Sequence, residues 1–108
     1  MVFSMLLTDD ASRDLEDIYD SIDRCDGRGN ADYVLDRIEK AFNSLSENPE
    51  RGAFPKELLA VGMREFREIF FKPYRMIYRI MENHVYALLI ADGRRDMQKL
   101  LQRRLLQA

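Results

Sequence analysis

The sequence is poor in the residues from which disulfides, metal sites and membrane spans are built. Cys25 is the only cysteine among 108 residues, so the chain cannot form an internal disulfide or a thiolate metal site. The apolar stretch Tyr86–Ala91 is far shorter than the roughly 20 residues that a membrane helix needs. The first residues lack the basic start and the cleavage site of a signal peptide. We therefore expect a protein of the cytoplasm that makes no use of a membrane.

Motifs that hold cofactors or activate nucleophiles are also absent. The sequence has no Gly-rich phosphate loop, no metal-ligand spacing and no nucleophile triad, so we expect neither a cofactor nor a metal. With 46% hydrophobic and 33% charged residues, the composition is that of a compact folded protein. The length fits one domain that covers residues 1–108.

Charge is divided unevenly along the chain. Residues 1–50 hold 5 Lys/Arg and 13 Asp/Glu, a net charge of −8, whereas residues 51–108 hold 12 and 6, a net charge of +6. The sum is −2. This pattern allows a basic surface on an acidic protein, and it equally allows two halves that attract each other in the fold.

The first half of the sequence predicts a strand and two helices. Val2–Leu7 is an apolar run without a helical period, and Thr8 is placed to cap a helix after it. Gly27-Arg28-Gly29 ends that helix, and Asn30 is expected to cap a second one that stops near Pro49. The short connection predicts an antiparallel hairpin. The apolar faces of the two helices are Ala11, Leu15, Ile18, Ile22 and Cys25, and then Val34, Ile38, Ala41, Phe42 and Leu45.

The second half predicts three strands and a closing helix. Polar and apolar residues alternate from Met63 to Met81, with a break at Lys72-Pro73, which indicates two strands. His84–Ile90 follows as a third strand, apolar on both faces and therefore central. Arg94–Leu106 is a short basic helix. The order β-α-α-β-β-β-α predicts a two-layer α+β domain, with helices on one face of a mainly antiparallel sheet.

Four stretches, in this order and spacing, resemble the RelE/ParE toxin superfamily, and the likeness extends over the whole chain. They are Leu7–Ile22, Arg37–Gly52, Pro73–Ile80 and Gly93–Asp96, which look like the family's strand-to-helix start, second helix and exit, third strand and ParE-type closing motif. The resemblance implies a RelE/ParE-like fold. It also implies the toxin of a type II toxin–antitoxin (plasmid stabilisation) system, neutralised by a cognate antitoxin.

Some members of the superfamily cut mRNA on the ribosome, and this sequence matches only part of their site. The resemblance aligns Arg75 and Arg95 with phosphate-binding arginines, and Lys56 and Glu57 lie where some relatives carry a general base. RNA cleavage also needs an acid for the leaving oxygen. Residues 97–108 contain neither tyrosine nor histidine, and His84 lies at the wrong end of its strand.

The closing motif and the missing acid therefore favour a ParE-like toxin. The resemblance implies that such a toxin binds DNA gyrase and inhibits it. Such a protein needs a recognition surface, which we place on the exposed sheet edge and the basic C-terminal segment. We expect no catalytic residue. The partners implied are a ParD-like antitoxin and gyrase, with DNA contacted only through the antitoxin complex. A toxin that has lost its activity and persists as an antitoxin ligand is a third possibility. The predicted partner-binding residues are Arg75, Arg79, Arg94 and Arg95.

Each candidate also has a purely structural interpretation. Arg75 and Arg79 would form the solvent face of a strand. Cys25 would be a small buried hydrophobe and His84 a residue beside a turn. The remaining basic and methionine side chains would support a helix and fill the core: Arg94, Arg95, Arg103 and Arg104, then Met63, Met76, Met81 and Met97.

Overall fold

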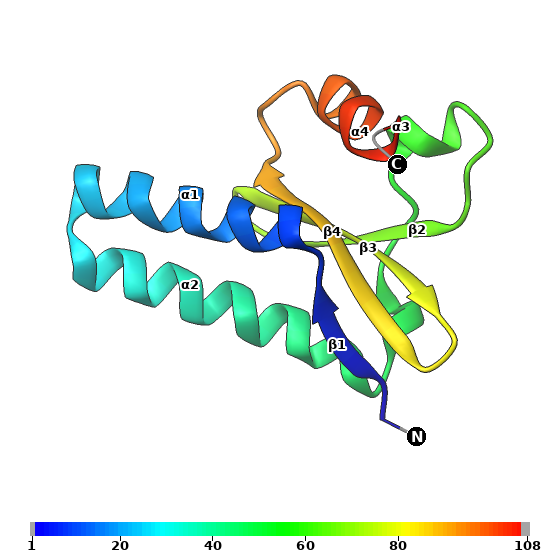
Figure 1. The fold of residues 1–108 in the computed structure, drawn as a ribbon, viewed down its shortest axis with the longest axis horizontal. Helices are drawn as coiled ribbons and strands as arrows, with labels where there is room; N and C mark the ends of the chain where they lie inside the picture. The colour runs from blue at the N-terminus through cyan, green and yellow to red at the C-terminus, as the bar shows by residue number, and fades with distance from the viewer. Residues whose placement is uncertain (1, 107–108) are drawn as a thin grey trace.

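The computed structural model describes residues 2–106, and it confirms the predicted class and order (Figure 1). Short helical turns are added between the hairpin and the second strand. No helix among the described residues is long and apolar enough to cross a membrane. The elements are β1 (Ser4–Leu7), α1 (Asp9–Asp26), α2 (Arg28–Asn43), η1 (Ser44–Ser46), η2 (Pro49–Arg51), α3 (Lys56–Leu59), β2 (Phe66–Phe71), β3 (Tyr74–Met81), β4 (His84–Asp92) and α4 (Met97–Leu106).

The sheet has four strands in the order β1-β4-β3-β2. β1 pairs with β4 in parallel, and the other two pairings are antiparallel, so the sheet is mainly antiparallel as predicted. β4 is a central strand, as its apolar run indicated. β1 covers only the first part of β4, from His84 to Ala87. The rest of that edge of β4 is left without a strand beside it.

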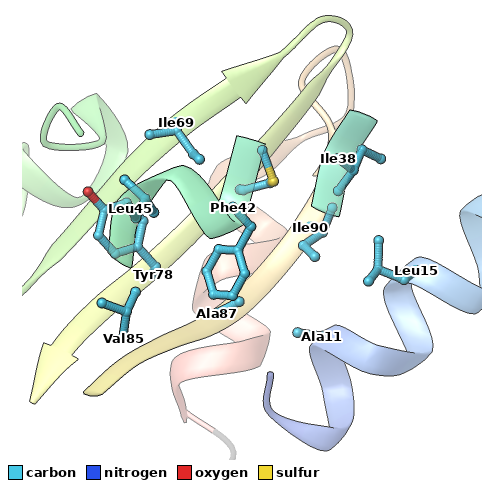
Figure 2. Packing of buried hydrophobic residues seen from close by; sticks show 11 residues of the cluster. Ala11, Leu15, Ile38, Phe42, Leu45, Ile69, Tyr78, Val85, Ala87 and Ile90 are labelled. Atoms are coloured by element: carbon cyan, nitrogen blue, oxygen red, sulfur yellow. The ribbon is translucent and has the colours of Figure 1, made fainter. Parts of the chain in front are cut away.

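The hairpin of α1 and α2 packs against one face of the sheet (Figure 2). Thr8 caps α1 as predicted, because its Oγ1 accepts a hydrogen bond from the Ala11 amide at 3.1 Å. The connection is tighter than predicted. Gly27, with φ of 91°, is the only residue between the helices, so Asn30 lies inside α2 and does not cap it. Cys25 is exposed near the hairpin tip, and the prediction that it is buried is wrong because the tip extends beyond the sheet.

The opposite face of the sheet is covered as well, which differs from the single covered face that we predicted. Leu58 of α3 and Met97 and Leu101 of α4 pack against side chains of β2, β3 and β4. Strand residues alternate between faces, so Ile77 points to this layer while its neighbours Met76 and Tyr78 point to the hairpin. An apolar second face must be buried, and α3 and α4 bury it.

Tyr78 joins the core to the loop that leads from α2 to β2. Its side chain is fully buried; the hydroxyl donates to the Pro49 carbonyl at 2.6 Å and accepts from the Gly52 amide at 3.0 Å. A Cβ atom at Gly52 would overlap this hydroxyl, so the close approach requires glycine. The Tyr78 hydroxyl, with both hydrogen bonds made, fixes the start of the segment that leads from the hairpin face of the sheet to α3 on the opposite face.

Candidate functional site

Arg75 lies inside the molecule, where it binds two carboxylates. On β3 it is 7% exposed, and its partners are Glu57 of α3 and Glu68 of β2. The Arg75 Nη1 and Nη2 atoms donate to the two oxygens of Glu57 at 2.9 and 2.8 Å. Nε donates to Glu68 Oε1 at 2.7 Å, and Nη2 lies 2.6 Å from the same oxygen. The guanidinium is therefore enclosed by charge-assisted bonds from two elements.

The two carboxylates respond differently to the shared arginine. Hydrogen bonds from Arg75 lower the pKa of Glu57. Burial raises the pKa of Glu68, because desolvation of the more deeply buried carboxylate outweighs its bond to Arg75. The pKa of Arg75 is raised by Glu57 and Glu68, so the arginine stays charged. With all three groups ionised, the cluster carries a net charge of −1.

A cleft of about 380 Å³ opens beside this cluster. Lys56 and Lys72 line it with exposed side chains, and neither makes an ion pair with another described residue. Phe54, Phe70, Pro73 and Gly93 complete the wall with Glu68 and Arg75. The cleft has the cations of a phosphate site, but its central arginine is already occupied.

Arg94 and Arg95 follow β4 at the same end of the sheet. Gly93 approaches Arg75 so closely that a Cβ atom there would lie 3.0 Å from the arginine's Cδ. Arg94 is 81% exposed at its side chain and binds Asp92, with Nη2 to Oδ2 at 2.6 Å. Arg95 is exposed and makes no ion pair within residues 2–106. Arg95 is thus the freer positive charge of the two.

Arg79 is not part of this group. Four residues along β3 separate it from Arg75, which is about 13 Å at strand spacing. Its guanidinium lies 5.8 Å from the centre of the Phe66 ring and lines a different hollow, of about 520 Å³, beside α4. The solvent-face interpretation is wrong for Arg75, which is buried, and Arg79 is half-buried. Whether either arginine contacts a partner stays a prediction.

The residues of the ribonuclease alternative are only partly brought together. Glu57 and Arg75 are in contact, but they bind each other, and Arg95 lies on the exposed turn. Tyr74, which sequence reasoning missed, lines a hollow with Arg95 and Asp92, and burial raises its pKa so that it stays protonated. Tyr74 and Arg75 are neighbours on a strand and point to opposite faces, so this tyrosine does not face the cleft.

Arg104 has a structural role that the sequence did not reveal. Its Nη1 and Nη2 donate to the Asp14 carboxylate of α1 at 3.0 Å each, and Nη1 also donates to the Leu88 carbonyl. Asp14 accepts from the Ile90 amide at 2.9 Å. These side chains form hydrogen bonds with backbone groups of the β4 edge that β1 does not cover, and they link α4 to α1.

An apolar groove runs between the hairpin and β1. Two adjoining hollows of about 510 and 190 Å³ share Leu7, Leu15 and Glu39 in their walls. Leu7 is 40% exposed, and β1 is an edge strand. The groove therefore offers both apolar side chains and unpaired backbone groups to a partner chain. Among the described residues, no three His, Cys, Asp or Glu side chains converge to hold a metal ion.

Both comparisons of the sequence point to the same family. Residues 5–97 match the model described as ParE toxin of type II toxin–antitoxin system, parDE. Toxin ParE3 of Caulobacter vibrioides is 31% identical over 93 residues, which are 86% of this chain and 89% of that protein.

Solved structures are similar in fold. A chain of the chromosomal ParDE system of P. aeruginosa has a TM-score of 0.70 at 20% identity, over 84% of this chain and 96% of that one. A chain of the RelBE2 toxin–antitoxin complex of Mycobacterium tuberculosis has a TM-score of 0.56 at 23% identity, over 85% and 92%. A double mutant of E. coli toxin RelE in the free state has a TM-score of 0.66 at 12% identity, over 98% of this chain and 99% of that one.

Proposed function

Because this chain belongs to the ParE toxin family of type II toxin–antitoxin systems, we propose that it inhibits DNA gyrase by binding it in the cytoplasm. The observation that carries the proposal is the state of Arg75. The one arginine that could neutralise a phosphorane in the cleft is bound to Glu57 and Glu68. A toxin whose candidate phosphate site is closed needs a mode of action that rests on recognition.

The chemistry of RNA cleavage is poorly supported here. A base, an acid and free cations must act on one phosphate. Glu57 is held by Arg75, no tyrosine or histidine is among the residues lining the cleft, and Arg95 faces another hollow. These features favour the gyrase-binding alternative over the ribonuclease.

The basic turn after β4 is the surface that we propose for gyrase. Arg94 and Arg95 are both exposed there, and their positions are fixed by the last strand and the tie between Asp92 and Arg94. Arg95 is the principal contact in this proposal, because it makes no ion pair with a described residue, whereas Arg94 is bound to Asp92. Arg75 is expected to support this end of the sheet from within.

Induced expression distinguishes the two targets in cells. We expect DNA replication to stop before translation, as measured by pulse labelling of DNA and of protein in the same culture. Primer extension on translated mRNA should show no new codon-spaced ends. Early arrest of translation, with new codon-spaced cuts made by the wild-type toxin, would instead establish the ribonuclease.

We also propose that a ParD-like antitoxin neutralises the toxin by laying an apolar segment in the groove beside β1. Leu7→Glu places a charge in that groove and is expected to weaken the toxin–antitoxin complex at least about tenfold. Leu59→Glu is a matched control, because Leu59 is 38% exposed and lies on α3, away from the groove. Isothermal titration with the protein encoded by the adjacent reading frame measures both. Equal affinities for the two variants would place the antitoxin elsewhere.

A further inference from the structure

The cleft beside Arg75 combines the elements of an anion site with groups that exclude anions. Three cations, Lys56, Lys72 and Arg75, line its wall or its rim. The paired geometry of Arg75 with Glu57, two parallel N–H···O bonds at 2.9 and 2.8 Å, is the geometry that an arginine also uses for phosphate. The protein's own carboxylates thus stand where phosphate oxygens would bind.

We propose that Glu57 and Glu68 are specificity-determining residues that close a phosphate site, so that the cleft rejects phosphate and phosphodiester groups. These residues close the site whichever protein the toxin inhibits, because only the contacts within the cluster are involved. Glu57 comes from α3 and Glu68 from β2, so the site is closed by two elements. A phosphate that approached Arg75 would find each nitrogen of its guanidinium already bonded to a carboxylate and two like charges beside it.

The aromatic side chains of the cleft extend the inference to nucleic acid. Phe70 is 56% exposed at the rim, and the guanidinium of Arg75 lies 5.9 Å from the centre of its ring. Exposed aromatic rings beside cations form the usual platform for an unpaired base and its phosphate. Removal of the two carboxylate charges leaves these groups in place and changes the charge of the cluster from −1 to +1.

The test is the double variant Glu57→Gln with Glu68→Gln. Glutamine keeps the shape and an acceptor oxygen for Arg75 but no charge. We expect inorganic phosphate to bind the variant at least about tenfold more tightly than the wild type, seen as a phosphate-dependent rise in Tm and by NMR shifts at Arg75. A single-stranded RNA oligonucleotide forms the second arm and separates a free-phosphate site from a nucleic-acid site.

Control variants distinguish the effect of this cluster on phosphate binding from the effect of the protein's net charge. Glu47→Gln with Glu50→Gln makes the same change of charge at exposed residues and should leave phosphate affinity unchanged. Adding Arg75→Met to the double variant should abolish the gain. If the double variant does not fold, Glu57→Gln alone must show a phosphate-dependent rise in Tm. Phosphate affinity that is equal in wild type and in the folded variants would overturn the proposal.

Discussion

Arg75→Met is expected to lower the free energy of unfolding by about 3–5 kcal/mol, because it leaves two buried carboxylates without their cation. Methionine retains most of the side-chain volume, so the loss reports the charge and not a cavity. Urea denaturation followed by circular dichroism measures it. A typical domain has only about 5–15 kcal/mol of stability, so this loss is a large fraction of the total.

The matched control for this prediction is Arg79→Met on the same strand. Arg79 makes no ion pair with a described residue, so its replacement should cost well under about 1 kcal/mol. Adding Glu57→Gln and Glu68→Gln to Arg75→Met should restore much of the loss, because no unpaired charge then remains. Equal midpoints for the two single variants would show that the buried cluster does not stabilise the fold.

The Glu57 carboxylate should also contribute to acid sensitivity. Its pKa in the folded protein is lowered from the ordinary 4.5 by Arg75. The stabilisation is therefore present above the unfolded-state pKa and is lost as the pH falls through the lowered folded-state value. Glu57→Gln should accordingly remove part of the pH dependence of stability on the acid side.

The double reversal Arg94→Glu with Arg95→Glu is expected to abolish gyrase inhibition at concentrations where the wild type inhibits fully. Mispaired charges at a docked interface cost several kcal/mol, which is at least a hundredfold in affinity at about 1.4 kcal/mol per tenfold. The two single variants should differ in how strongly they reduce inhibition. Arg95→Glu should have the larger effect, since Arg94 is already bound by Asp92. A supercoiling assay over a range of toxin concentrations measures all three variants.

A second double reversal controls for net charge in this experiment. Arg24→Glu with Arg28→Glu changes the total by the same amount at exposed residues of the hairpin tip. It should leave inhibition unchanged. Thermal melting of each variant confirms that the fold is intact. If Arg94→Glu/Arg95→Glu is well folded and fully inhibitory, the basic turn is not part of the gyrase surface.

Most of the fold follows from periodicity and turn chemistry. The alternation between Met63 and Met81 located two strands, and Thr8 marked the start of α1. The layer formed by α3 and α4 was missed, although β3 and β4 carry apolar residues on both faces. The apolar side chains of Ile77 and Leu89 show that a second face is buried, but strand periodicity does not show which element covers it. The four residues of α3 are too few to give a helical period.

The site was located only in part, because ion pairs depend on which strands and helices meet. Arg75 was singled out from its motif, but its alternation with Met76 and Tyr78 suggested a solvent face. In the sheet Glu68 pairs with Ile77, and so it reaches Arg75 diagonally from the next strand. The register of two strands was needed to find that contact. The bond between Asp14 and Arg104, residues 90 positions apart, left no local signal at all.

The most direct measurement of the central claim is supercoiling of relaxed plasmid by purified gyrase in the presence of the purified wild-type toxin. We predict that the toxin inhibits supercoiling or traps cleaved DNA on the enzyme, and that added antitoxin reverses the effect. Gyrase that is unaffected at toxin concentrations that arrest growth in cells would contradict it.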